Sequence, residues 1–177
     1  NEVRGGGGCF VFAGVYKENV EINKRIRITG KNATVEGGDG SAFVLLVDGI
    51  VIEHFIIRNC WDEAGITIYR ENATIAFCDL YNNYYGIYLK ANNVSIKNCK
   101  VYGNSFAGIF LENCMKINIS GCDIYCNNEG IMAEHSSYGR IENNVISNNS
   151  INGLKFVFSH FNDIINNDFL DNIYGIY

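Results

Sequence analysis

Glycine recurs along this chain at a nearly constant interval, and this interval limits what the chain can fold into. The series consists of Gly65, Gly86, Gly108, Gly130, Gly153 and Gly175. Its successive gaps are 21, 22, 22, 23 and 22 residues, and each glycine precedes an apolar residue. A fixed period in this range is typical of a solenoid, in which each repeat forms one structural unit stacked on the next.

Each repeat contains about three short runs in which every second residue is apolar, as in Ile66 and Ile68 or Ile87 and Leu89. This alternation predicts half-buried strands. Asn, Gly and Asp separate the runs and favour turns. The chain has no proline, so nothing interrupts strand pairing. We therefore predict an all-β solenoid, a parallel β-helix of about seven coils with about 22 residues per coil.

Stacked coils place equivalent residues in columns about 4.8 Å apart. One predicted inward column contains Ile52, Ile75, Ile96, Ile119, Ile141 and Ile164. A second contains Ile57, Leu80, Val101, Ile124, Ile146 and Phe169. A polar column contains Asn83, Asn104, Asn127, Asn149 and Asn172. Because Asn is a common turn residue that bonds to the backbone, we interpret the polar column as a ladder at a turn.

The pattern G-I-x-L, N-x-x-I and N-x-x-x-x-N resembles the right-handed parallel β-helix repeats of the pectin-lyase-like superfamily, particularly the CASH and NosD-like group. Residues 12–38 resemble the usual first coils of that group, with Gly14, Tyr16, Glu18 and Val20 in its G-x-Y-x-E-x-V pattern, and the resemblance covers about residues 11–177. We expect a single domain over 1–177, with a lead-in at 1–10, first coils at 11–43 and regular repeats at 44–177. Because the chain starts at Asn1, we expect either a fragment of a longer protein or a processed chain.

The charge pattern excludes some partners. The net charge is −5, with both signs interspersed and no basic patch, so we expect no nucleic-acid partner. No apolar run is long enough to predict a membrane span. Five N-x-S/T sequons are glycosylation candidates, and we expect an extracellular or cell-surface protein. The candidates are Asn32, Asn72, Asn93, Asn118 and Asn148.

Seven cysteines occur, and Cys78, Cys99 and Cys122 fall at the same place in successive repeats. Three interpretations remain open for this column. Free cysteine packs as a small apolar residue, which favours a buried stack of thiols. Neighbouring coils also bring Cα atoms within disulfide range. A soft metal is the third alternative, but no CxxC pair or His/Cys cluster supports it, so we predict no metal site and no cofactor.

The catalytic motifs of the resembled superfamily are missing. The chain has no Asp-Asp pair, no GHG, no RIK and no DPHE sequence, so no catalytic residue is transferred from that resemblance. One weak catalytic candidate remains. Glu112 and Glu134 are predicted neighbours in one column, with Lys90 one coil earlier and His135 adjacent. Two carboxylates about 5 Å apart suit a retaining glycosidase or a calcium site, although a solvated charged face, with Lys90 screening Glu112, is the favoured interpretation.

Aromatic residues form the most conspicuous predicted surface. The candidate binding residues are Tyr84, Tyr85, Tyr88, Phe106, Phe110, Tyr174 and Tyr177. Exposed aromatic patches mark ligand or partner surfaces. We predict a non-catalytic structural or binding module whose partner is a carbohydrate or a neighbouring protein subunit. Because the last repeat stops just after Gly175, homo-oligomers stacked end to end along the axis are one expected form. The alternative is a polysaccharide hydrolase or lyase whose site the sequence does not identify.

Overall fold

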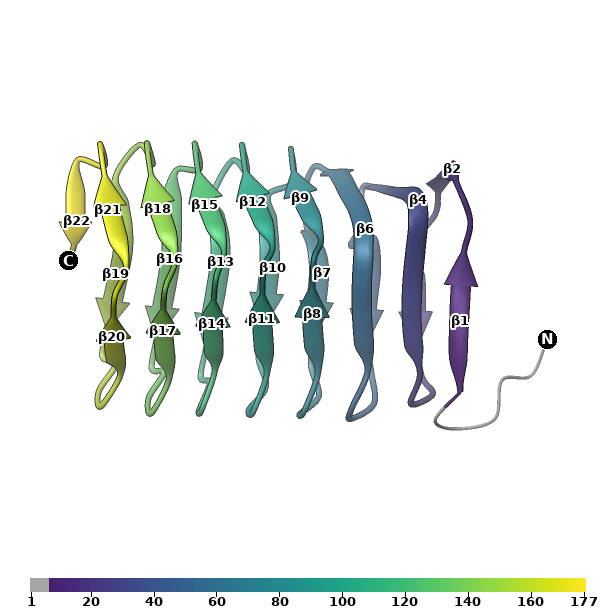
Figure 1. Ribbon diagram of the computed structural model, residues 1–177, viewed down its shortest axis with the longest axis horizontal. Coiled ribbons are helices and arrows are strands. Elements are labelled where there is room, and N and C mark those ends of the chain that lie inside the picture. Colours follow the sequence, from purple (N-terminus) through teal and green to yellow (C-terminus); the bar gives the residue numbers. More distant parts are fainter. Residues whose placement is uncertain (1–6) are drawn as a thin grey trace.

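The computed structural model describes residues 7–177 and shows a solenoid in which coil follows coil along a single axis (Figure 1). All regular elements in this part of the chain are strands. The solenoid has about eight turns of about 22 residues, one more than the glycine series predicts, and it confirms the predicted parallel β-helix. The additional turn comes from the first coils, which lack the repeat glycine. Of the predicted lead-in, residues 1–6 lie outside the described part, and residues 8–10 belong to strand β1.

The strands form two parallel sheets, here called sheet A and sheet B. Sheet A has 14 strands and bends in the middle, because the long strands β4 and β6 extend across both of its halves. One half contains β1 (Gly8–Val11), β8 (Thr74–Ala76), β11 (Ser95–Lys97), β14 (Asn118–Ser120), β17 (Arg140–Glu142) and β20 (Asp163–Ile165). The other half contains β2 (Gly14–Lys17), β9 (Asp79–Tyr81), β12 (Lys100–Tyr102), β15 (Asp123–Tyr125), β18 (Val145–Ser147) and β21 (Asp168–Leu170). The shared strands are β4 (Arg27–Gly38) and β6 (Val51–Cys60).

Sheet B lies behind sheet A in Figure 1 and has eight strands in chain order along the axis. They are β3 (Val20–Ile22), β5 (Phe43–Leu45), β7 (Ala64–Ile68), β10 (Tyr85–Leu89), β13 (Ala107–Glu112), β16 (Glu129–Glu134), β19 (Asn152–Val157) and β22 (Tyr174–Ile176). Strands pair in parallel with the equivalent strands of neighbouring coils. Most coils contribute two short strands to sheet A and one strand to sheet B, whereas the coils of β4 and β6 contribute one long strand to sheet A.

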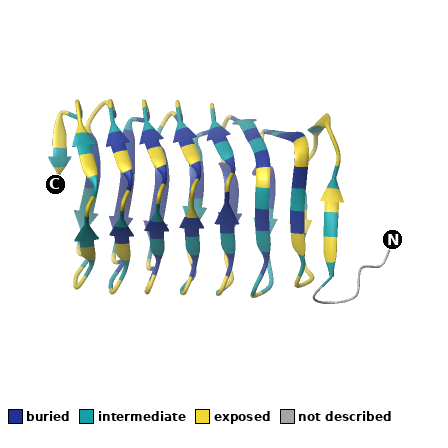
Figure 2. Cartoon of the chain, viewed as in Figure 1, coloured by how far each residue is buried: buried dark blue, intermediate teal, exposed yellow. Residues whose placement is uncertain are grey.

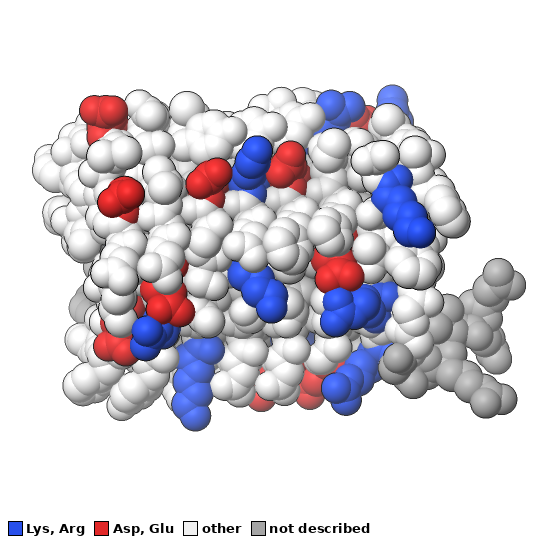
Figure 3. Space-filling view, in the orientation of Figure 1, with Lys and Arg blue, Asp and Glu red and all other residues white. Residues whose placement is uncertain are grey.

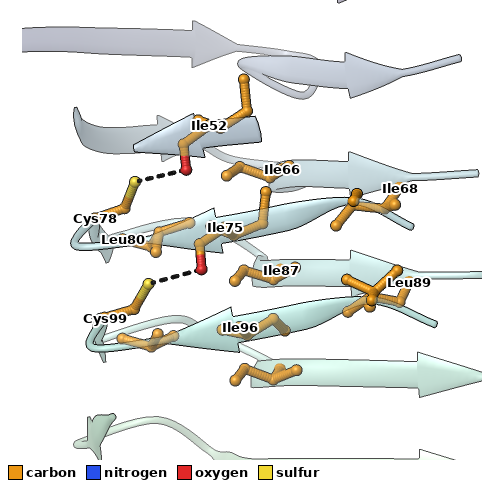
Figure 4. Close-up of a cluster of buried hydrophobic side chains, with 14 of the residues drawn as sticks. Ile52, Ile66, Ile68, Ile75, Cys78, Leu80, Ile87, Leu89, Ile96 and Cys99 are labelled. Carbon is orange, nitrogen blue, oxygen red and sulfur yellow. Dashed lines mark hydrogen bonds between the residues drawn. The ribbon is translucent and has the colours of Figure 1, made fainter. Parts of the chain in front are cut away.

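The core lies between the two sheets and consists of the predicted columns. The strand register pairs Ile52 with Ile75 and Ile75 with Ile96, and the side chains of all three are fully buried. The second column is confirmed in the same way, from Ile57 through Leu80 onwards. Figure 4 shows these side chains interleaving with those of sheet B, and Figure 2 shows burial alternating along most strands of sheet A. Such alternation is what a strand with one buried face requires.

The repeat glycines are required by the contact between coils. A Cβ added to Gly108 would lie 2.7 Å from the carbonyl oxygen of Gly130 in the next coil and 3.0 Å from Cγ2 of Ile124. Equivalent additions at Gly65, Gly86, Gly130 and Gly153 would meet the next glycine's oxygen at 2.4–2.8 Å. These distances are shorter than carbon–oxygen contact allows. Glycine therefore recurs here because the backbones of neighbouring coils approach too closely for a side chain.

The asparagine column is a buried ladder at the turn between sheet A and sheet B. Asn104 Nδ2 donates to Asn127 Oδ1 at 2.9 Å, and Asn127 Nδ2 donates to Asn149 Oδ1 at 3.1 Å. The residue before each ladder position has a positive φ of 53–62°. These left-handed residues are Asn82, Gly103, Cys126, Asn148 and Asp171, and Asn59 has the same conformation before Cys60, one coil earlier. Asn and Gly tolerate this conformation better than other residues, which accounts for their density at the turns.

All seven cysteines are free thiols, and the predicted Cys78, Cys99 and Cys122 column is a buried stack. Each thiol of this stack faces a main-chain carbonyl of the preceding coil, such as Cys99 Sγ to Ile75 O at 3.8 Å. Asn144 continues the column, and its Nδ2 donates to Ile119 O at 3.0 Å. A thiol and an amide thus occupy the same position in the repeat. Cys114 begins a comparable ladder that continues with a serine, Ser136.

Candidate functional site

The outer face of sheet B carries the side chains that are best suited to bind a ligand or to take part in a reaction. Outward positions alternate with the fully buried Ile87 and Leu89 of strand β10 and their equivalents. One outward column contains Thr67, Tyr88, Phe110, Met132 and Lys155. A neighbouring column contains Ala64, Tyr85, Ala107 and Glu129. The third brings Glu112 next to Glu134, as predicted, with Val157 following.

Five predicted binding residues come together on this face, and we call them the sheet-B aromatic cluster. They are Tyr84, Tyr85, Tyr88, Phe106 and Phe110. Tyr85 stacks on Phe110 with ring centroids 5.4 Å apart, and Tyr84 stacks on Phe106 at the same distance. The rings of Tyr84 and Tyr85 are nearly perpendicular, at 86°. Since the two stacks meet at a right angle, the cluster presents ring faces as well as ring edges.

The members of the cluster differ in exposure. Phe110 is buried, with 9% of its surface exposed, because it packs with Met132 and Ala107 under the other rings. The remaining four rings are partly exposed. Phe110 therefore supports the cluster from below, and a ligand on this face would meet the other four.

Glu112 lies at the edge of the cluster and is held on two sides. The Tyr88 hydroxyl donates to Glu112 Oε2, and Lys90 Nζ lies 3.0 Å from Glu112 Oε1. The hydrogen bond from Tyr88, followed by that from Lys90, lowers the pKa of Glu112. Burial, together with this hydrogen bond to Glu112, raises the pKa of Tyr88. The site thus contains a fixed carboxylate, a fixed ammonium and a neutral phenol within one contact network.

Glu134 and His135 are separated by the end of strand β16. Glu134 is the last residue of the strand and lies beside Glu112 in the register. His135 is exposed in the following turn, has φ 48°, and stacks on Phe158 with ring centroids 5.2 Å apart. The structure therefore places the two glutamates together on the outer face of sheet B, while the imidazole is engaged with a ring of the next coil.

A third carboxylate on this face was not predicted from the sequence. Glu129 is 5% exposed, and its Oε2 accepts hydrogen bonds from the backbone and side-chain nitrogens of Asn152 at 3.2 and 2.8 Å. Lys155 Nζ lies 3.6 Å from its Oε1. These contacts with Asn152 and Lys155 join strand β19 to strand β16.

The other two predicted binding residues lie in the last coil. Tyr174 and Tyr177 are 53% and 68% exposed, with ring centroids 6.0 Å apart. Met132 and Lys155 stand between them and the sheet-B aromatic cluster in the outward column. The aromatic stripe predicted from the sequence is thus divided into a central cluster and a terminal pair.

The outer face of sheet A carries a second aromatic column, which sequence reasoning missed. Tyr102 stacks on Tyr81 and on Tyr125, each with ring centroids 4.9 Å apart, and the rings are within 13° of parallel. Arg58 Nη1 donates to the Tyr81 hydroxyl at 2.9 Å and closes the column. The available signal was the recurrence of a tyrosine at the end of the equivalent strand in three successive repeats. Their faces cover one another, so this column stabilises the register more than it offers a binding surface.

Four of the five sequon asparagines, Asn32, Asn72, Asn93 and Asn148, are exposed and have positive φ values. Three of them lie at turns, whereas Asn32 lies within strand β4, where the register with β6 shifts. Asn118 differs, because it begins strand β14 and its Oδ1 is buried. The four exposed positions remain glycosylation candidates on steric grounds, and Asn118 is the least suitable.

The remaining features of the described residues concern metal binding, membrane spans and surface charge. Within residues 7–177, no cluster of three or more His, Cys, Asp or Glu side chains could hold a metal ion. This part of the chain also contains no helix with the length and apolarity needed to cross a membrane. Figure 3 shows that charges of both signs are scattered over the sheet A face between large uncharged areas.

Solved structures with the same fold include enzymes and viral proteins. The A-module of mannuronan C-5 epimerase AlgE4 from Azotobacter vinelandii has a TM-score of 0.80 and 15% identity, over 97% of this chain and 56% of that one. The enzymatically active domain of tailspike protein 2 from bacteriophage CBA120 has a TM-score of 0.64 and 14% identity, over 97% and 39%. Pectate lyase Pel9A has a TM-score of 0.63 and 14% identity, over 90% and 62%.

At these identities the similarity concerns the fold alone, and the chain spans about half the length of the epimerase modules. No curated protein matches the sequence. The family of right-handed β-helix regions matches residues 13–177, which is nearly the whole chain. The chain therefore belongs to the family of right-handed β-helix regions.

Proposed function

We propose that this chain is a non-catalytic β-helix module, extracellular or on a cell surface, that binds a carbohydrate on the outer face of sheet B. The observation that carries the proposal is the sheet-B aromatic cluster beside the Glu112 and Lys90 pair. Flat rings suit the C–H faces of sugars, whereas carboxylate and ammonium groups bond to hydroxyls. Both kinds of contact are present within two neighbouring coils.

The geometry of the sheet favours an elongated ligand. Successive coils repeat at about 4.8 Å, and the outward side chains form rows parallel to the axis. Tyr85 and Phe106 belong to neighbouring coils, and their rings are 5.3 Å apart. A chain molecule lying along the axis would therefore meet one coil after another. The names of two solved relatives, mannuronan epimerase and pectate lyase, refer to polysaccharides, which is consistent with this ligand class.

The experiment is a glycan-array screen followed by titration calorimetry with the best ligand. We expect Tyr84→Leu and Phe106→Leu each to weaken binding at least about tenfold, because each removes a partly exposed ring, whereas Leu still covers Phe110. Tyr102→Leu is the matched control, since it removes a stacked ring from sheet A. Equal affinity in all three variants would contradict binding on this face.

A polysaccharide hydrolase or lyase is the second candidate, and the register of Glu112 with Glu134 favours it. Carboxylates about 5 Å apart suit a retaining glycosidase. Glu112, held ionised by Tyr88 and Lys90, would be the nucleophile, and Glu134 the acid. Polysaccharide cleavage by the wild type that disappears in both Glu112→Gln and Glu134→Gln would establish this function. It would also replace the non-catalytic proposal.

For a protein partner, we propose a second copy stacked on the last coil. Strand β22 forms the edge of sheet B, and several apolar side chains near it are more than half exposed. They are Ile173, Tyr174, Ile176 and Tyr177. An exposed apolar strand edge favours strand addition. Light scattering over a concentration series should show association that Ile176→Lys reduces, and a monomer at all concentrations would refute the stacking.

A further inference from the structure

Trp61 is the only tryptophan of the chain, and its surroundings differ from those of the other aromatic residues. It follows Cys60 at the end of strand β6, in the turn that leads to sheet B, and it is 58% exposed. This turn has four residues between Cys60 and Gly65, whereas the equivalent turn of the next coil has two between Asn83 and Gly86. The additional length places an indole on the edge of the solenoid.

Two hollows in the surface meet at Trp61. The larger has a volume of about 470 Å³ and is lined by side chains of the first three coils, including Lys17, Glu18, Asn19, Glu36 and Asn59. The smaller has about 170 Å³ and is lined by the following coils, including Asn82, Gly103 and Ser105. Because the lining passes from coil to coil on both sides of Trp61, the two hollows follow one another along the axis.

The faces of the indole are not covered by other rings. Among the residues that the structure describes, Trp61 makes no ring contact, although nearly all neighbouring aromatic residues stack on one another. Tyr84 in the next coil, for example, stacks on Phe106. An exposed indole without a stacking partner leaves a flat apolar surface between two polar hollows.

The polar lining of the larger hollow is held in place. Asn19 Nδ2 donates to the carbonyls of Gly37 and Ser41 at 2.8 and 2.9 Å. Glu36 Oε1 lies 2.8 Å from Arg58 Nη2 and also accepts from Asn59 Nδ2 at 3.3 Å. Fixed amides and carboxylates reduce the ordering that a ligand would otherwise impose on binding.

The charges around Trp61 disfavour an acidic ligand. Glu18 lines the larger hollow, and Asp62 and Glu63 directly follow the tryptophan. The carboxylate of Glu36 is already paired with Arg58, which leaves Lys17 as the cation of the lining. With a net charge of −5 for the whole chain, a polymer of sugar acids would be repelled more than attracted. Amides, carboxylates and a hydroxyl around an aromatic face suit an uncharged sugar.

We propose that Trp61 and the two hollows beside it form a binding site for an uncharged oligosaccharide that lies parallel to the axis, with one sugar ring stacked on the indole. The residues that line these hollows do not include any member of the sheet-B aromatic cluster. The inference rests on the proposed carbohydrate binding only for the class of ligand.

Tryptophan fluorescence tests the proposal directly, because the single indole reports on this site alone. The probes are hexasaccharides of β-1,4-glucose, β-1,4-mannose and β-1,4-xylose, with hexagalacturonate as the acidic comparison. We expect at least one neutral probe to change the emission of Trp61 in a saturable manner and hexagalacturonate to change it at least tenfold more weakly. Trp61→Ala should weaken calorimetric binding of the same probe at least about tenfold, whereas Trp61→Phe should retain part of it.

Two controls separate this site from the one on sheet B. Phe106→Leu should leave the fluorescence titration unchanged, and Asn82→Ala should weaken it. Saturable binding that leaves the emission unchanged and survives Trp61→Ala would refute this site and leave the sheet B proposal intact. An emission change with hexagalacturonate alone, or with no probe, would overturn the inference.

Discussion

The Oδ1 atom of Asn127 accepts two hydrogen bonds from Asn104 in the preceding coil, from its side-chain nitrogen at 2.9 Å and from its backbone nitrogen at 3.1 Å. The Nδ2 atom of Asn127 donates to Val101 O at 3.0 Å and to Asn149 Oδ1 at 3.1 Å. One amide, 1% exposed, therefore joins three coils. Every polar atom of the side chain has a partner, as burial requires.

We expect Asn127→Ala to lower the free energy of unfolding by at least about 2 kcal/mol, because it leaves buried donors and acceptors without partners. Urea unfolding measures this difference. The neighbouring Asn128 makes no side-chain hydrogen bond among the described contacts, so Asn128→Ala is the matched control. Equal midpoints for the two variants would show that the ladder contributes little to stability.

The repeat glycines lead to a steric prediction. Gly108→Ala should destabilise the protein by about 1–3 kcal/mol or more, the range expected for overpacking, because the added Cβ would meet Gly130 O at 2.7 Å. Gly175→Ala provides the comparison, since a Cβ there would find its nearest atom at 3.6 Å, on Phe169. Thermal unfolding of both variants should show a lower midpoint for Gly108→Ala alone. Similar midpoints would mean that the coils move apart easily.

Thiol labelling should distinguish the cysteines by position. Cys126 is exposed and should react rapidly with a thiol reagent in the native protein. Cys99 is 1% exposed, and burial raises the pKa of the Cys114 thiol, so both should react only on unfolding. Mass spectrometry of the labelled peptides gives the order of reaction. Fast labelling of Cys99 would mean that this column faces outward, and Cys126→Ser should remove the fast phase.

The contacts of Glu112 predict a dependence of stability on pH. Its folded-state pKa is lowered below 4.5, so the ionised form is favoured by folding. The stabilisation is fully present above the unfolded-state pKa and is lost as pH falls through the lowered folded-state value. The free-energy difference between wild type and Glu112→Gln should therefore be constant near neutral pH and shrink below about pH 4.5. Urea unfolding from pH 7 to pH 3 tests this, and Lys90→Gln should weaken the effect.

The columns of this fold could be predicted because a strict period determines which residues are neighbours. The pairings of Ile52 with Ile75, Asn104 with Asn127 and Glu112 with Glu134 all follow from counting residues between glycines. The first coils lack the repeat glycine and have long strands such as β4, which is why they were under-counted. Periodicity therefore predicts register reliably wherever the repeat is regular.

The surroundings of individual side chains could not be predicted in the same way. Counting places Glu129 in an outward column, but its burial depends on how Asn152 and Lys155 lie across it. The accessibility of Trp61 depends on a turn that departs from the repeat. Ring orientation is likewise set by local packing. Tyr102 stacks between two tyrosine rings, whereas Tyr84 stacks on the single ring of Phe106. Binding properties depend on these departures from the average repeat.

The close contact between glycine backbones also fixes the distance between neighbouring coils along the axis. Since each coil advances by about the same 4.8 Å, the coil that carries Trp61 and the coil that carries Phe106 are separated by a whole number of such steps, set by the paired strands. Insertion or loss of one complete repeat would change that separation by one increment without disturbing either set of contacts. A change in the number of repeats can thus adjust the distance between the two proposed ligand sites in discrete steps of one coil.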